Sequence, residues 1–171
     1  TRDRVLSREE YQKLLDACQK SSLNMLEDMV KFCYQTGARQ GEMLRLKREH
    51  IDFEKKQITF FDTKNGLDRT LPIADATVAI LKKYRFGEFV FNVIARRFRK
   101  HFSIACKRAN VENFRAHDLR ACFCTNALLS GLSIAQVSFL SGHRQWSQLK
   151  KYTRIKPEDL SEKINNVVNF K

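Results

Sequence analysis

The spacing of apolar residues changes between His50 and Ile73, and this change limits what the chain can fold into. Three short stretches there are rich in β-branched and aromatic residues and are separated by turn-forming residues, at 51–53, 57–62 and 69–73. They predict a three-stranded antiparallel sheet. Elsewhere the apolar residues recur at helical spacing. The first helices are expected after Ser7 and up to Gly37, and the others over 41–47, 75–84, 94–109, 119–130, 134–140, 148–153 and 157–167.

Helices that surround one small sheet, with the strands early and most helices late, predict a mostly α domain of the α+β class. The chain has 171 residues, of which 43% are hydrophobic. That is enough for one packed domain that buries about 70% of its unfolded surface, and it leaves little room for a second core. A single domain over residues 1–171 is therefore predicted. Since Thr1 is no natural start, we expect this domain to have been excised from a longer protein.

Charge indicates the class of partner. The chain has 32 Lys and Arg against 19 Asp and Glu, a net charge of +13, which favours nucleic acid over an acidic protein or a membrane. A solvated helix face would explain any one basic cluster, but together the clusters predict DNA contacts, at Arg96, Arg97, Arg99, Lys100, Lys150 and Lys151. No apolar run approaches the ~18 residues of a membrane span.

The five cysteines are odd in number and lie in apolar segments that are predicted to be helical. This favours reduced, buried thiols in a cytosolic protein. Cys122 and Cys124 are two apart, and no second pair has the spacing of a zinc site, so no metal is expected.

Two arginines have the chemistry that a reacting phosphodiester requires. Attack by an oxygen nucleophile builds negative charge on the non-bridging oxygens, and a planar guanidinium can bond two of them. Arg39 and Arg120 are the candidates, and Glu42, three residues after Arg39, can orient its guanidinium. Taken alone, Arg39 reads better as a surface arginine at a helix start, and it is its neighbours that favour a role in the site.

Two histidines and a tyrosine accompany these arginines. His117 lies three residues before Arg120, so both side chains should project toward one ligand, and Asp118 is expected to cap the helix that follows. His143 comes after the helix-ending Gly142, and Tyr152 follows nine residues later among basic residues that favour a phenolate. A capped helix or a solvated turn would explain each histidine alone. The other tyrosines read as packing residues, at positions 11, 34 and 84.

Lys64 lies in a predicted turn between two strands, where solvated lysines are common. Its position alone therefore argues nothing. A mobile ammonium group there could nevertheless protonate the 5′ oxygen that leaves phosphorus when a DNA strand is cut.

The ordered set of Arg39, Lys64, His117, Arg120, His143 and Tyr152 resembles the active-site signature of the tyrosine recombinases, the phage-integrase family. The resemblance extends from residue 36 to residue 152. It implies a helical catalytic domain with the family's fold and a site-specific recombinase that cuts and rejoins double-stranded DNA. In such an enzyme Tyr152 would form a 3′-phosphotyrosine bond, and no metal or nucleotide cofactor would be needed.

The resemblance also implies roles for the other signature residues. Arg39 and Arg120 would clamp the phosphate, and Lys64 would be the general acid. His117 would be a proton-transfer partner and His143 a phosphate donor. Residues 1–156 would form the catalytic core and 157–171 a tail helix that docks on a neighbouring protomer in a synaptic tetramer.

The chain departs from the common pattern in three respects. Ala121, Cys122 and Phe123 follow Arg120 where many members have His-Thr, while Leu149 and Arg154 replace a threonine and a histidine around the tyrosine. The family's N-terminal core-binding domain is expected to be absent. Two alternatives stay open, a type IB topoisomerase and a catalytically idle DNA-binding module. Each reading places the protein on DNA in the cytoplasm.

Overall fold

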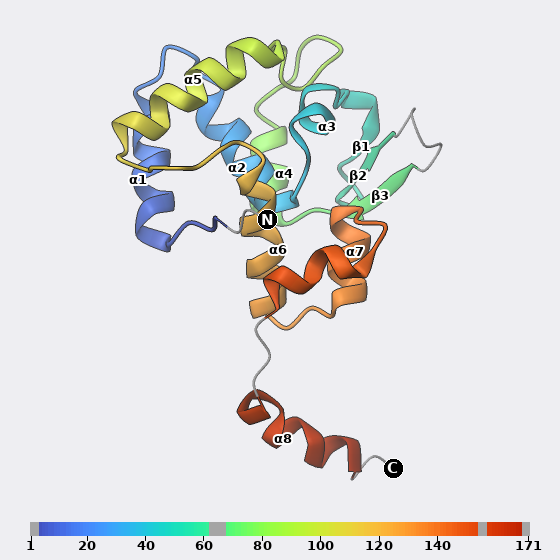
Figure 1. The fold of residues 1–171 in the computed structure, drawn as a ribbon. Helices are drawn as coiled ribbons and strands as arrows, with labels where there is room; N and C mark the ends of the chain where they lie inside the picture. The colour runs from blue at the N-terminus through green and yellow to red at the C-terminus, as the bar shows by residue number, and fades with distance from the viewer. Residues whose placement is uncertain (1–3, 62–67, 154–156, 169–171) are drawn as a thin grey trace.

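A computed structural model describes residues 4–61, 68–153 and 157–168 of the chain. Figure 1 shows a helical body with a small sheet at one side, and a last helix that stands apart from the body. In chain order the elements are α1 (Arg8–Gln19), α2 (Leu26–Thr36), α3 (Gln40–Leu44), η1 (Arg48–His50), β1 (Ile51–Asp52), β2 (Gln57–Phe60), β3 (Arg69–Pro72), α4 (Asp75–Leu81), α5 (Ala95–Arg108), α6 (Asp118–Leu129), α7 (Ile134–Ser141), η2 (Trp146–Tyr152) and α8 (Pro157–Val168). The predicted mostly α, α+β fold class is confirmed.

The first helices begin and end where their sequence signals lie. At the start of α1 the backbone N–H of Glu10 donates to Oγ of Ser7, and the Glu10 carboxylate accepts from the Ser7 backbone N–H, which is the predicted capping box. α2 ends at Gly37, whose φ of 70° suits glycine. α2 is the central helix, because it packs against α1, α4 and α6, and its Met29 and Phe32 are fully buried.

The sheet is antiparallel with the order β1-β2-β3, as predicted. Ile58 pairs with Leu71, and the hydroxyl groups of the next pair, Thr59 and Thr70, lie 2.8 Å apart. The strands are shorter than the predicted ones. β2 ends at Phe60, and Phe61 lies outside the ladder with its ring close to that of His50.

The predicted helix over 41–47 is wrong at its end, because α3 stops at Leu44. The carbonyl oxygen of Leu46 accepts a hydrogen bond from the N–H of Val90, at 2.9 Å, and Lys47 forms a β-bridge with Phe89. These long-range backbone bonds compete with the last helical turn and explain its loss.

Two hydrophobic clusters hold the helices together. The larger one joins α1, α2 and α5 to the sheet, and the smaller one joins the C-terminal half of α6 to α7 and η2 through Cys124, Ala127, Val137 and Leu149. Leu149 is fully buried there. The segment that contains it was predicted as an α-helix over 148–153 but is a 3₁₀ helix that begins at Trp146.

The remaining expectations concern the cysteines, the tyrosines and the tail. The five cysteines are free and buried, as predicted. Tyr11 stacks on Tyr34, and Tyr84 packs edge-on against Phe91, so these tyrosines are packing residues. The predicted tail helix is present as α8. None of the helices in the described part of the chain combines the length and apolar character that crossing a bilayer requires.

Candidate active site

Arg120 lies at the centre of a cluster of polar side chains. It projects from the first turn of α6 and is only 3% exposed. Its Nη1 donates to the carbonyl oxygen of Gly37 at 3.0 Å, and its Nη2 lies 3.3 Å from Nδ1 of His143. Burial, together with the nearby positive charge of Arg39, lowers the pKa of Arg120 to about 10. The guanidinium therefore stays charged at neutral pH and is held on two sides by the protein.

His143 is positioned by the end of α7. The helix terminates at Gly142, with a φ of 73°, and the Ser138 hydroxyl donates to the carbonyl oxygen of His143 at 2.6 Å. The Ser141 hydroxyl donates to the carbonyl oxygen of Val137 and lies 2.6 Å from Nδ1 of His143. Since a hydroxyl has one proton, its oxygen is left to accept from Nδ1, which assigns a hydrogen to that nitrogen. The other ring nitrogen, Nε2, lies 3.4 Å from Nη2 of Arg120.

Glu42 joins two further arginines to the cluster. Its Oε1 lies 3.0 Å from Nη1 of Arg39 and 2.9 Å from Nη1 of Arg69, and its Oε2 accepts from the backbone N–H of Arg39. Burial favours the neutral carboxyl, but the bonds from Arg69 and Arg39 outweigh it and hold the pKa of Glu42 below its ordinary value. The expected contact between Glu42 and Arg39 is thus present.

The sequence prediction missed Arg69. Its residue type and its place near a turn made it read as an ordinary strand residue, yet its side chain is only 13% exposed. A signal was available in the sequence. Arg69 and the buried Leu71 are two residues apart in β3, so their side chains face the same side of the sheet. Nε of Arg69 is buried and has no hydrogen-bond partner among the described residues.

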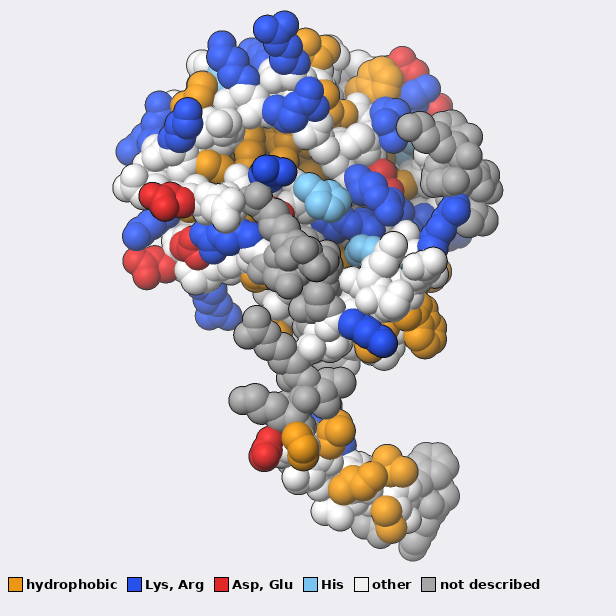
Figure 2. All heavy atoms as spheres, in the orientation of Figure 1, with side chains coloured by type: hydrophobic (Ala, Val, Ile, Leu, Met, Phe, Trp, Pro, Cys, Tyr) orange, Lys and Arg blue, Asp and Glu red, His pale blue; other side chains and the backbone are white. Residues whose placement is uncertain are grey.

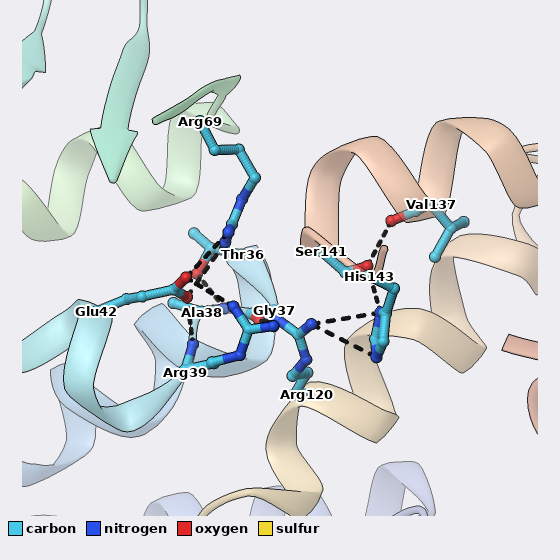
Figure 3. Close-up of polar contacts among 10 residues, drawn as sticks. All are labelled: Thr36, Gly37, Ala38, Arg39, Glu42, Arg69, Arg120, Val137, Ser141 and His143. Atoms are coloured by element: carbon cyan, nitrogen blue, oxygen red, sulfur yellow. Dashed lines mark hydrogen bonds and ion pairs between the residues drawn. The ribbon is translucent and has the colours of Figure 1, made fainter. Parts of the chain in front are cut away.

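Figure 3 shows how the three arginines converge on one region, from β3, from the start of α3 and from α6, with His143 on the far side of Arg120. Arg39, Glu42, Arg69 and His143 border a groove of about 1020 Å³. Trp146 is exposed and lines the same groove. The region is therefore open to a ligand and positively charged, a combination that suits a phosphate group.

His117 borders a neighbouring cavity. It is exposed at the start of α6, and it lines this cavity with Gln40, Arg99 and Arg115. The prediction for Asp118 is wrong in detail. α6 begins at Asp118 itself, and its carboxylate accepts from the backbone N–H of Arg115, which precedes the helix. This bond fixes the turn that leads into α6.

The side chains of two predicted site residues, Lys64 and Tyr152, lie outside the described part of the structure. Lys64 lies outside the described residues. For Tyr152 the structure describes the backbone, at the end of η2, which packs against α6 and α7. η2 is thereby held against the helix that carries Arg120 and the helix that ends before His143.

The described residues that depart from the family pattern lie in packed positions. Cys122 is fully buried in the larger core, and Leu149 fills the smaller one. Phe123 lies against Gly37, because a Cβ atom on that glycine would be 2.4 Å from the ring. The phenyl ring thus supports the turn whose carbonyl oxygen holds Arg120. Position 154 lies outside the described residues.

Basic side chains surround the cluster. Figure 2 shows Lys and Arg side chains over much of one face, with His side chains among them near its centre. The predicted DNA contacts of α5 are exposed, because Phe98 and Phe102 take the buried side of the helix and leave Arg96, Arg97, Arg99 and Lys100 outside. Lys150 is exposed on η2, and the side chain of Lys151 is outside the described part. No group of three or more His, Cys, Asp or Glu side chains that could hold a metal ion occurs among the described residues.

The fold and this cluster of arginine and histidine side chains agree with the result of sequence comparison. The model of the phage integrase family matches residues 4–159. The chain therefore belongs to the phage integrase family.

Known proteins resemble the chain over nearly its whole length. It is 30% identical to the shufflon-specific DNA recombinase of Escherichia coli, over 96% of this chain and 43% of that protein. It is 29% identical to the tyrosine recombinase XerA of Pyrococcus furiosus, over 96% of this chain and 62% of that protein. Among solved structures, the catalytic domain of bacteriophage HP1 integrase superposes with a TM-score of 0.80 at 26% identity and covers 98% of both chains. The chain thus spans about half the length of the shufflon-specific recombinase and of XerA.

Proposed function

We propose that this chain is the catalytic domain of a site-specific DNA recombinase, which cuts and rejoins DNA through a 3′-phosphotyrosine bond at Tyr152. The observation that carries the proposal is the pairing of Arg39 and Arg69 with the carboxylate of Glu42, next to Arg120 and its neighbour His143. The groove is lined by four arginines, at positions 39, 45, 69 and 144, and by two carboxylates, at positions 42 and 68, so positive charge is in excess there. Such an array favours a phosphate most when that phosphate gains charge in the transition state.

In the proposed reaction the Tyr152 oxygen attacks phosphorus, and the bond from phosphorus to the 5′ oxygen breaks. The tyrosine proton leaves to a base, for which His117 is the candidate, and Lys64 protonates the 5′ oxygen. Arg39, Arg120 and His143 bind the non-bridging oxygens. The phosphotyrosine bond retains the energy of the broken phosphodiester, so the reverse attack by a 5′ hydroxyl reseals the strand.

We also propose double-stranded DNA as the partner, bound along the face that carries the site. The exposed cations of α5 and Lys150 on η2 add positive charge outside the groove lining. Contacts of this kind neutralise phosphates and release counterions, so the affinity should fall steeply as salt is raised. The elements from α1 to η2 would together form the catalytic core.

Covalent attachment of the protein to DNA tests the function directly. A duplex with a nick close to a candidate cleavage site loses the short cut strand, so the phosphotyrosine product accumulates. The wild-type protein should form a DNA adduct that resists SDS, and Tyr152→Phe should form none. Affinity should change little, because one hydroxyl adds little to a surface with this charge.

Two results would contradict the proposal. An adduct formed by Tyr152→Phe would exclude this tyrosine as the nucleophile. Specific DNA binding without any adduct from the wild-type protein, on nicked substrates that carry candidate inverted repeats, would favour a catalytically idle binding module. Tyr11→Phe is a matched control, because that tyrosine is stacked in the core, away from the groove.

We further propose that α8 couples protomers in a synaptic tetramer. Leu160, Ile164, Val167 and Val168 recur at helical spacing and are exposed, on a helix that stands apart from the body. An isolated helix of 12 residues is marginally stable in water, and an exposed apolar stripe gains free energy when another surface covers it.

Deletion from Pro157 onward should weaken tetramers on DNA more than it weakens binding to a single site. Ile164→Asp should have the same effect without shortening the chain, whereas Asn166→Asp adds the same charge on the other side of the helix and should have little effect. Native gels with one and two DNA sites measure both properties. Tetramers that survive the deletion, or a domain that no longer folds without α8, would reject this role.

A further inference from the structure

Arg69 contacts no reacting group in the proposed reaction, yet its side chain is held by several elements of the fold. It begins β3, and its two terminal nitrogens each donate to a different oxygen of Glu42, at 2.9 and 3.1 Å. Both side chains are largely buried, at 13% and 12% exposure. A fork of two parallel bonds fixes the orientation of a carboxylate as well as its position.

The same guanidinium contacts two other elements. Its central carbon lies 5.0 Å from the ring centre of Phe60, its cross-strand neighbour in β2. On the side of α7 it lies against Gly142, because a Cβ atom there would be 2.4 Å from Nη1 of Arg69. Arg69 thus fills the space between the sheet and the turn that carries His143.

These contacts bear on Arg39 through Glu42. The Arg39 side chain is 45% exposed, and Oε1 of Glu42, which it bonds, is the oxygen that Arg69 also holds. The charges matter as well. Arg39, Glu42 and Arg69 together carry +1, whereas Arg39 and Glu42 without Arg69 would be neutral. Removal of Arg69 would therefore loosen Glu42 and would leave its carboxylate to neutralise Arg39.

We propose that Arg69 is a positioning residue for strand cleavage. It orients Arg39 through Glu42, it keeps the cluster positively charged, and it supports the turn before His143. This inference rests on the proposed function, because it assumes that Arg39 and His143 bind the reacting phosphate.

Single-turnover cleavage of the nicked duplex by folded Arg69→Met tests the proposal. Misplacement of a phosphate-binding group by a fraction of an ångström to an ångström lowers rates by up to about 100-fold, so we expect a loss of about 10- to 100-fold with DNA affinity within about threefold. Arg69→Lys keeps the charge without the two parallel bonds and should be intermediate. Arg4→Met is the matched control, because Arg4 also pairs with a half-buried glutamate, Glu10, outside the groove. It should lower stability without slowing cleavage.

Two further measurements separate positioning from general support of the fold. If Arg69 acts through Glu42, the double variant Arg69→Met, Glu42→Gln should cleave no more slowly than the slower single variant. A substrate with a methylphosphonate at the cut site has less negative charge for arginine to stabilise. The defects of Arg69→Met and Arg39→Met should then shrink by similar factors, whereas a defect from partial unfolding would be the same on both substrates.

The failures are distinguishable. If the wild-type protein forms no adduct, the proposed function is wrong and this inference falls with it. If the wild-type protein cleaves DNA and Arg69→Met cleaves it equally fast, only the role of Arg69 is wrong. Additive losses in the double variant, or an undiminished defect on the methylphosphonate, would also overturn it.

Discussion

Replacement of Arg120 by lysine keeps a positive charge at the centre of the site but removes the guanidinium fork. In the structure Nη1 of Arg120 donates to the Gly37 carbonyl oxygen, at 3.0 Å, while Nη2 contacts His143, at 3.3 Å. A lysine has one compact ammonium group on a flexible stem, and it cannot reproduce this planar geometry and also bind a phosphate oxygen. Arg120→Lys therefore tests whether geometry or charge alone supports cleavage.

The cleavage rate should fall by a factor that matches the loss of one preorganised donor. Such a loss costs about 10²- to 10³-fold, or about 3–4 kcal/mol in the barrier. Binding should weaken much less, because many exposed cations contribute to it. The assay is single-turnover cleavage of the nicked duplex at saturating protein, with DNA affinity measured in parallel.

The same variant should respond to pH in a way that the wild-type protein does not. Burial, followed by the charge of Arg39, lowers the pKa of Arg120 to about 10, so the wild-type group stays charged from pH 7 to pH 9. The same surroundings would lower the pKa of a lysine below its ordinary ~10.4. Cleavage of subsaturating DNA by the variant should thus fall relative to wild type as the pH rises from 7 to 9.

The folding stability of Arg120→Lys should rise over the pH range in which its cleavage rate falls. Because the lysine would have a lower pKa in the folded protein than in the unfolded chain, the unfolded chain binds more protons between those two pKa values. The free energy of unfolding of Arg120→Lys, relative to wild type, should therefore rise between pH 7 and pH 9. Urea unfolding at the two pH values measures this.

Two results would refute the reasoning about Arg120. Cleavage by Arg120→Lys at a rate near that of the wild type at pH 7 would mean that a point charge is enough. Matching pH profiles for the two proteins would mean that burial does not destabilise a cation at this position. Arg4→Lys is the control for a general effect of the substitution, since Arg4 lies outside the groove.

Two other predictions follow from the chemistry and the backbone. Lys64→Ala should be slow on ordinary DNA and largely rescued on a substrate with a 5′-bridging sulfur, because a thiolate leaves without a proton; equal impairment on both substrates would mean that Lys64 only positions DNA. Gly142→Ala and Gly131→Ala both place a side chain at positive φ and should each lose about 1–2 kcal/mol of stability, measured by urea unfolding. Only Gly142→Ala should also slow cleavage, because its methyl group meets Arg69 whereas nothing lies near Gly131, and equal cleavage by the two variants would count against the contact.

The sequence determined the elements whose signals are local. The capping box at Ser7 and Glu10 and the glycine that ends α2 each act within about one helical turn, so the first two helices could be predicted closely. Stretches rich in β-branched and aromatic residues, separated by short turn-forming segments, predicted the antiparallel sheet, because a short turn can join only antiparallel neighbours. The contact of Arg39 with Glu42 was also predictable, since three residues separate them on one helical turn.

The tertiary structure decided where those elements end and what completes the site. α3 stops at Leu44 because the chain after it bonds to Val90, and η2 is a 3₁₀ helix whose Leu149 is buried between α6 and α7. No local pattern encodes a partner more than 40 residues away in sequence. The residue types predicted a phosphate-binding function, but their spacing could not say which backbone atoms hold them.

Arg120 and Arg69 illustrate the difference. The sequence predicted that Arg120 is a phosphate ligand, and its hydrogen bond to Gly37 joins residues 83 positions apart. Arg69 carried only the weak signal of a charged residue on the face of the strand that also carries Leu71, and its partner Glu42 lies 27 positions away. A hydrogen bond or an ion pair forms only where packing brings its two groups within about 3 Å. That proximity is a property of the assembled core, so sequence determined the chemistry of the groups and only the fold determined which of them act together.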